Sequence, residues 1–157
     1  MLQCIHVTDI EWAKNVKDLN SDSPVNFWKR PGNDFFLDSG SWLYFTPYNF
    51  PFIIGRGRYL NPPERMSIEQ AWSYYGLRNG RHSIGDLIMA ARDVLEIPGP
   101  SASTRLLCVE LSSLQWLPDR KYYRCHEDWT RTPKPYKILE AHLTQDLMDH
   151  FHNCGHQ

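Results

Sequence analysis

The hydrophobic and polar positions follow two different periods along the chain, which predicts short strands mixed with short helices. The apolar run at residues 3–7 (QCIHV) predicts a strand. Apolar residues then recur at helical spacing within residues 12–19, and Thr8 and Glu11 match a capping box in front of them. Residues 20–24 are rich in turn-forming residues. The first unit is therefore predicted to be a strand, a helix and a turn.

The middle of the chain again shows the hydrophobic patterns of both strands and helices. Residues 41–45 (SWLYF) and residues 52–60 (FIIGRGRYL) are apolar and aromatic runs that predict strands, the second one interrupted by glycines. A helix is predicted to begin at Ser67, where Gln70 completes a capping box, and another helix is predicted to begin near Ser83. Two strands followed by two helices are therefore expected here.

The last third predicts a long strand at residues 105–117, a polar and aromatic loop at 118–135, and a helix at 144–151. The predicted elements do not alternate as regular strand–helix–strand units, so we assign the fold class α+β, built on a small mixed sheet or barrel. At 157 residues the chain is expected to hold one domain, with residues 1–140 as its body and residues 141–157 as a helical tail.

The stretch from Asn26 to Arg30 (NFWKR) fits neither period, and we interpret it as an irregular loop. Phe27 and Trp28 either plug the end of the core or form the wall of a pocket. An amide, two aromatic rings and the cations of Lys29 and Arg30 are what a site needs to stack a flat base and hydrogen bond its edge.

The composition is that of a folded chain, with 41% hydrophobic and 22% charged residues. No apolar run approaches the length of a membrane span, and the N-terminus has no secretory signal pattern. The four cysteines form no closely spaced pair, which favours free thiols in a reducing compartment. These features predict a cytoplasmic protein without a membrane partner.

Charge is distributed unevenly although the net charge is only −1. Residues 51–105 contain seven arginines, no lysine and five acids, and residues 120–137 contain six basic residues and two acids. A positive face built from these two segments would suit a phosphate backbone, because arginine contacts phosphate with two donors. Arg56 and Arg58 are expected on one face of their strand, since residues two apart point the same way. An ordinary solvated surface is the alternative.

Known catalytic and metal-binding patterns are not found. The glycines at 55–57 lack the rest of a phosphate-binding loop and are more typical of a bulge or a close backbone approach. The histidines and cysteines near residues 125–126 and 150–156 are not spaced like a zinc site. No activated nucleophile and no pair of carboxylates suited to acid–base chemistry is visible. We expect no metal, no cofactor and no catalytic motif.

Taken together in their order, several segments resemble the N-terminal domain of bacterial restriction endonucleases that end in an HNH nuclease domain. The segments run from about residue 5 to residue 140: VTDIEW (7–12), VNFWKRP (25–31), GSWLYF (40–45), IIGRGRYL (53–60), SIEQAWSYYGLRNGRHSIGDL (67–87), LLCVEL (106–111), Trp116-Leu117-Pro118 and Asp128-Trp129. No HNH motif follows residue 140, so the resemblance does not extend to cleavage of DNA.

Such domains resemble the PUA superfamily, which includes the EVE, ASCH and SRA readers. The resemblance implies a curved β pseudobarrel with flanking helices and a pocket for a nucleobase. It further implies that the chain recognises a modified, flipped cytosine-type base in duplex DNA, in prokaryotic or phage defence, with a separate nuclease subunit as a further partner. The implied pocket residues are Asn26, Phe27, Trp28, Tyr44 and Tyr59. The implied contacts to the nucleic-acid backbone are Lys29, Arg30, Arg56, Arg58, Arg120, Lys121 and Arg124.

Three alternatives stay open. The chain could be an RNA-binding module of the same fold, an RNA-cleaving enzyme of the ASCH type, or a structural adaptor that recruits a nuclease. RNA-specific contacts require recognition of the 2′-hydroxyl, so competition between RNA and DNA separates the first alternative from the DNA reading.

Overall fold

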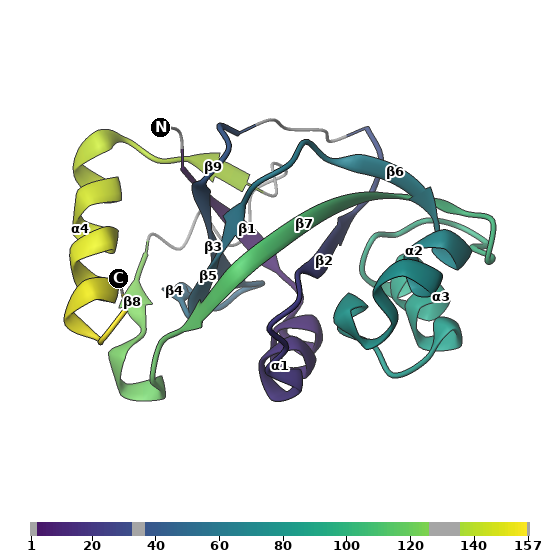
Figure 1. The fold of residues 1–157 in the computed structure, drawn as a ribbon, viewed down its shortest axis with the longest axis horizontal. Coiled ribbons are helices and arrows are strands. Elements are labelled where there is room, and N and C mark those ends of the chain that lie inside the picture. Colours follow the sequence, from purple (N-terminus) through teal and green to yellow (C-terminus); the bar gives the residue numbers. More distant parts are fainter. Residues whose placement is uncertain (1–2, 33–36, 126–135, 157) are drawn as a thin grey trace.

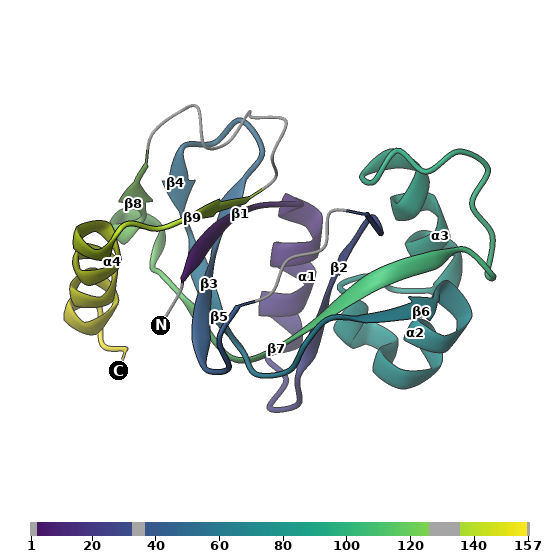
Figure 2. The same ribbon diagram turned by 90° about the horizontal axis from the view of Figure 1, so that it is seen from above.

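A curved, mostly antiparallel sheet organises the chain. The computed structural model describes residues 3–32, 37–125 and 136–156. Among these residues, seven strands form one sheet in the order β2-β7-β5-β3-β1-β9, with β6 also paired to β7 (Figures 1 and 2). These strands are β1 (Cys4–Thr8), β2 (Val25–Lys29), β3 (Ser41–Pro47), β5 (Gly55–Tyr59), β6 (Glu64–Ser67), β7 (Arg105–Trp116) and β9 (Tyr136–Ile138). A separate two-stranded ribbon pairs β4 (Phe52–Ile53) with β8 (Tyr123–Arg124).

The sheet bends where the pairing of β7 with β5 is irregular. β1 runs parallel to β3, whereas the other pairs are antiparallel. The long strand β7 pairs with β2, β5 and β6, and its register against β5 shifts between Arg56 and Arg58. Ser113 of β7 adopts a positive φ of 51° at this irregularity. A bulge of this kind increases local twist, so β7 curls from one end of the molecule to the other.

The glycines of β5 lie where β7 side chains cross the strand. A Cβ placed on Gly55 would lie 2.6 Å from a ring carbon of Trp116, and one on Gly57 would lie 2.8 Å from a methyl of Leu114. The absence of side chains lets these two β7 residues pack directly on the β5 backbone. The prediction of a close backbone approach at 55–57 is therefore confirmed.

Within the described ranges, four α-helices and two short 3₁₀ turns pack with the sheet. They are α1 (Ile10–Leu19), α2 (Ile68–Tyr75), η1 (Gly76–Asn79), α3 (Ile84–Asp93), η2 (Asp119–Lys121) and α4 (Ala141–Asn153). In Figure 2, α1 lies within the curve of the sheet, α2 and α3 cover one end of the molecule, and α4 packs at the opposite end. The sheet and helices together form the predicted α+β pseudobarrel. No described helix is long and apolar enough to cross a membrane.

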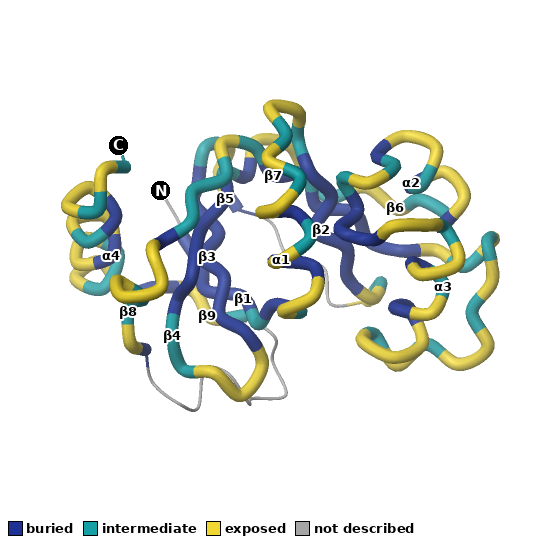
Figure 3. The backbone as a smooth tube through the Cα atoms, turned by 90° about the horizontal axis from the view of Figure 1, so that it is seen from below, coloured by how far each residue is buried: buried dark blue, intermediate teal, exposed yellow. Residues whose placement is uncertain are grey.

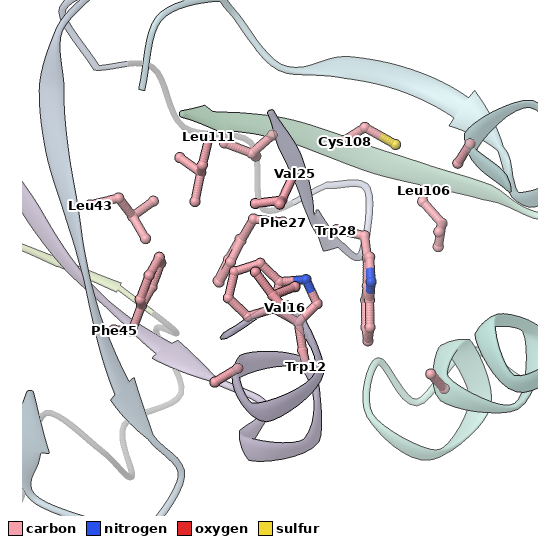
Figure 4. Close-up of a cluster of buried hydrophobic side chains, with 14 of the residues drawn as sticks. Trp12, Val16, Val25, Phe27, Trp28, Leu43, Phe45, Leu106, Cys108 and Leu111 are labelled. Carbon is pink, nitrogen blue, oxygen red and sulfur yellow. The ribbon is translucent and has the colours of Figure 1, made fainter. Parts of the chain in front are cut away.

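Two buried clusters lie on different faces of the sheet. The larger one joins α1 to β2 and β3, where Trp12 meets Phe27 and Phe45 edge-on at 5.1 and 5.4 Å between ring centres (Figure 4). The smaller one lies under α4, where Leu147 and Phe151 are buried with residues of β1 and β3. The segment expected to be a tail thus contributes a helix to the core.

The structure corrects the interpretation of residues 26–30 as an irregular loop. Residues 25–29 form β2, which pairs with β7 over its whole length, and all five residues are buried. A strand buried on both faces need not alternate apolar and polar residues, so the period-two pattern was missing. The capping box at Thr8 is also wrong, because Thr8 ends β1 and Asp9 caps α1 by accepting from the backbone of Glu11.

Other elements follow the sequence more closely. The helix that begins after Ser67 has the predicted capping box with Gln70, and Ser83 caps α3. The predicted strand at 52–60 is divided into β4 and β5, and only β5 joins the main sheet. The last helix begins at Ala141 instead of Thr144, with Glu140 as its N-cap. The Asp128-Trp129 part of the family resemblance lies outside the described residues.

Candidate functional site

Three side chains from β1, β2 and β9 form a cluster that combines a cation, an imidazole and a phenol. His6 of β1 pairs in register with Tyr136 of β9, and their rings stack with centres 6.1 Å apart. The ammonium of Lys29, at the end of β2, lies 4.9 Å from the centre of the Tyr136 ring. Phe27 shares a strand face with Lys29 and meets the His6 ring edge-on at 4.7 Å. We call His6, Lys29 and Tyr136 the β1–β2–β9 site.

Burial gives this site its unusual electrostatics. His6 and Lys29 are each only 4% exposed. Loss of hydration, and secondly the positive charge of Lys29, lower the pKa of His6 from 6.5 to about 3. His6 is therefore a neutral imidazole at physiological pH. Its Nδ1 lies 2.7 Å from the carbonyl oxygen of Val7, so Nδ1 carries the proton and Nε2 is the acceptor nitrogen of the ring.

The neighbouring thiol of Cys4 is uncharged. Burial raises the pKa of Cys4 to about 12, although Lys29 acts in the opposite direction, so the thiol stays protonated. The ammonium of Lys29 thus lies in a buried environment next to the ring of Tyr136 and close enough to His6 to lower the pKa of that imidazole. Within the described part of the chain, no group of three histidine, cysteine or acidic residues is arranged to hold a metal ion.

Asn26 and Trp28 lie on the other face of β2 and bond to η1. The amide nitrogen of Asn26 donates to Oδ1 of Asn79 at 2.9 Å and to the sulfur of Cys108 at 3.3 Å. The indole N–H of Trp28 donates to the backbone oxygen of Asn79 at 2.8 Å. Oδ1 of Asn26 has no hydrogen-bond partner among the described residues. Both residues are buried, so their predicted role in reading and stacking a base stays a prediction.

A salt bridge completes this network from the helix side. Arg81, which follows η1, pairs with Asp9, the N-cap residue of α1, and its guanidinium lies 5.4 Å from the centre of the Trp28 ring. Arg81 is 4% exposed and the Asp9 side chain is 17% exposed. Gly80 has a positive φ of 72°, and a Cβ there would lie 2.4 Å from the Trp12 ring. The turn from Asn79 to Arg81 thus fits closely between α1 and β2.

Of the remaining predicted pocket residues, Phe27 and Tyr59 belong to the same buried cluster as Trp28, whereas Tyr44 belongs to the other cluster. Phe27 belongs to the core and points away from Trp28 across β2 (Figure 4). Tyr44 is fully buried on the α4 side, where its hydroxyl donates to Oε1 of Gln3 at 3.0 Å. Tyr59 is 2% exposed and packs in the larger core cluster. The four aromatic residues are thus divided between the two buried clusters, and Asn26 lies in the hydrogen-bond network around Asn79.

Arg56 and Arg58 share one neighbour, as their spacing predicts. Their guanidinium carbons lie 3.9 and 4.2 Å from the centre of the Trp42 ring. Arg56 also lies over Phe151 of α4 at 4.4 Å and donates to Oε1 of Gln115 at 2.7 Å. Burial is the main cause that lowers the pKa of Arg56. Because Arg56 is 2% exposed under α4, its expected contact with phosphate stays a prediction.

The other predicted backbone contacts are on the surface. Arg30 reaches the carbonyl oxygens of Leu95 and Glu96 at 3.5 and 3.3 Å. Arg120, Lys121 and Arg124 are exposed on η2 and β8. Of the predicted backbone contacts, Lys29 and Arg56 are therefore buried, Arg58 is half-buried, and the other four are exposed.

Sequence reasoning missed His6 and Tyr136, and it named Lys29 only as a contact to the nucleic-acid backbone. A histidine in the middle of a predicted buried strand was the available signal for His6. Tyr136 follows a proline-containing segment, and the residues around it show no hydrophobic pattern that would predict a strand. The pairing of these residues depends on β1 contacting β9 from the far end of the chain.

Solved structures with a similar fold define the class to which this architecture corresponds. The crystal structure of ASCH from Zymomonas mobilis matches with a TM-score of 0.62 and 14% sequence identity, covering 94% of this chain and 94% of that chain. A tyrosine-to-phenylalanine mutant of the same protein matches with a TM-score of 0.64 and 12% identity, over 94% of this chain and 96% of that chain. No family model matches the sequence, and no curated protein matches it.

The fold is therefore a PUA-like pseudobarrel of the kind seen in ASCH domains. The PUA-like part of the predicted resemblance is confirmed. Its narrower part, the likeness to the reader domains attached to HNH nucleases, has no support among these comparisons.

Proposed function

We propose that this chain binds nucleic acid, with RNA as its ligand, and that the β1–β2–β9 site receives part of that ligand. The observation that carries the proposal is the buried ammonium of Lys29, which lies 4.9 Å from the Tyr136 ring and helps to hold His6 neutral. A phosphate contributes the negative charge that such an ammonium attracts. The Tyr136 ring offers a surface for a base or a sugar.

The similarity to ASCH structures supports RNA over a modified DNA base. RNA binding is the alternative that the sequence raised for a chain of the ASCH type, and ASCH proteins are the structural neighbours. The DNA reading depended on Asn26 and Trp28 as a base pocket. Both side chains donate hydrogen bonds to their own chain instead. Base flipping, restriction and defence have no observation of their own to support them.

A competition experiment tests the proposal. A labelled single-stranded RNA and the DNA of the same sequence are titrated with the protein at two salt concentrations, and duplexes containing cytosine, 5-methylcytosine or 5-hydroxymethylcytosine are used as competitors. We expect the RNA to bind at least about tenfold more tightly than the DNA, and its affinity to fall as salt rises. Equal binding of RNA and DNA, or a preference for one modified duplex, would contradict the proposal.

The same samples distinguish binding from cleavage. Labelled RNA incubated with pure protein is followed over time on a denaturing gel. RNA that stays intact supports a binding module. Shortening that disappears in a Lys29→Met variant would assign an RNA-cleaving activity of the ASCH type to the same site.

A further inference from the structure

A second surface, formed by the β4–β8 ribbon and the segments beside it, combines exposed aromatic rings with cations. We define the β4–β8 surface as Tyr48, Phe50, Phe52 and Tyr122 together with Arg120, Lys121 and Arg124. Tyr48 is 66% exposed and Phe50 is 39% exposed. Both lie in the turn that joins β3 to β4, which is coloured as exposed in Figure 3.

Three of the aromatic rings, those of Phe50, Phe52 and Tyr122, form one connected group. Phe50 lies 4.9 Å from Phe52 between ring centres and meets Tyr122 at 6.0 Å with perpendicular planes. The turn is fixed by a backbone hydrogen bond from Phe50 to Pro47 at 3.1 Å, and Asn49 within it has a positive φ of 57°. This turn therefore holds Tyr48 and Phe50 outward on a defined backbone.

One cation lies directly beside these rings, and two more lie in the adjoining turn. Arg124 pairs in register with Phe52, and its guanidinium carbon lies 5.4 Å from the centre of the Phe52 ring. Arg120 and Lys121 precede Tyr122 in the short turn η2. Residues 47–53 and 118–125 together contain three basic residues and one acid, Asp119, which accepts a hydrogen bond from the Tyr122 hydroxyl at 3.0 Å. These two ranges carry a formal charge of +2, and Asp146 of α4 lies near enough to Tyr123 of β8 to act on it electrostatically.

This combination identifies the chemistry of the partner. Exposed aromatic rings next to cations are the arrangement with which proteins bind unpaired bases and the phosphates between them. A double helix hides its base faces, so rings held outward in this way favour a single strand. A partner protein with an apolar surface would not need three cations at this place.

We infer that the β4–β8 surface binds single-stranded RNA, with bases stacked on Tyr48 and Phe50 and phosphates held by Arg120, Lys121 and Arg124. The inference rests on the proposed function and adds the form of the ligand and a second place of contact. The two sites are linked through β3, because Phe45 pairs with His6 of the β1–β2–β9 site and Tyr48 follows three residues later.

The experiment uses a labelled ten-nucleotide oligouridylate, which stays unpaired, and an abasic ribose-phosphate oligomer of the same length. Binding of both ligands is measured for the wild type and for Tyr48→Ser and Phe50→Ser. Tyr74→Ser is the matched control, since Tyr74 is an exposed tyrosine (60%) on α2, outside both sites. Thermal unfolding of each variant verifies that it is folded.

We expect Tyr48→Ser and Phe50→Ser each to weaken binding of the oligouridylate by about tenfold, because each removes a stacking surface. Binding of the abasic oligomer should change little, and Tyr74→Ser should behave as the wild type. Arg124→Gln should weaken both ligands and reduce the salt dependence, because it removes a phosphate contact.

Three results would overturn the inference. If both serine variants bind the oligouridylate like the wild type, the β4–β8 surface does not bind the bases, although RNA binding elsewhere on the protein stands. If they lose affinity equally for the abasic oligomer, base stacking is not the interaction. If the wild type binds neither RNA ligand, the proposed function fails and the inference fails with it.

Discussion

The side-chain amides of Asn26 and Asn79, which are 53 residues apart, share a buried hydrogen bond of 2.9 Å. This bond ties β2 to the turn η1 that follows α2. The amide nitrogen of Asn79 also donates to the backbone oxygens of Ala71 and Gly76 at 3.1 and 2.9 Å. Asn79 thus satisfies carbonyl groups at the end of α2 and connects that end to the sheet.

Replacement of Asn79 by alanine should destabilise the fold. Asn79→Ala leaves the Asn26 amide without its oxygen partner and frees two buried carbonyl groups. We expect a loss of roughly 1–3 kcal/mol in the free energy of unfolding, the range for buried polar groups left unsatisfied. Urea denaturation followed by tryptophan fluorescence measures the change, and an unchanged midpoint would show that the network adds no stability.

Trp28 is expected to matter first for stability. Its ring is buried and its N–H is bonded to the Asn79 backbone, so Trp28→Ala should lower the free energy of unfolding by roughly 3–5 kcal/mol. Trp28→Phe keeps most of the buried ring and should lose clearly less. If Trp28→Ala is as stable as the wild type but binds RNA more weakly, Trp28 belongs to a ligand pocket, as the sequence suggested.

The stability of the protein should depend on pH through His6. Its pKa is about 3 in the folded chain and 6.5 as an unperturbed group, so between these values the unfolded chain binds a proton that the folded chain does not. The contribution of His6 to stability is therefore complete above pH 6.5 and is lost as the pH falls toward 3. The loss should be at most about 1.4 kcal/mol for each pH unit, the slope for the binding of one proton.

Comparison with a His6→Asn variant isolates this effect from the other titrating groups. Unfolding free energies of both proteins are measured from pH 7.5 to pH 5, above the range in which most carboxylates titrate. We expect the wild type to lose stability over this range more steeply than the variant. Parallel curves would mean that His6 titrates alike in the folded and unfolded chains.

Local signals predicted the helices well. The capping box of Ser67 with Gln70, and Ser83 at the start of α3, depend on residues three positions apart, which a sequence displays directly. The prediction of a bulge in the glycine strand had the same local basis. These elements form for reasons contained within a few residues of chain.

The candidate site could not be predicted in this way. β2 is buried on both faces, so NFWKR carried no alternation and was interpreted as a loop. Lys29 was recognised as a cation, but its burial depends on β1 and β9, and β9 lies more than a hundred residues further along the chain. The exposed aromatics Tyr48 and Phe50 lie between Pro47 and Pro51, which indicate the end of a strand but do not indicate which side chains are exposed.

The most direct test of the account is the affinity of the Lys29→Met variant for the single-stranded RNA that the wild type binds. Methionine keeps the length and apolar stem of the side chain without burying a charge, so the variant should fold. Lys14→Met on the exposed side of α1 is the matched control, and Lys29→Gln is a second variant. We expect both Lys29 variants to bind RNA at least about tenfold more weakly while Lys14→Met binds normally. Folded Lys29 variants that bind RNA as tightly as the wild type would contradict the assignment of the β1–β2–β9 site.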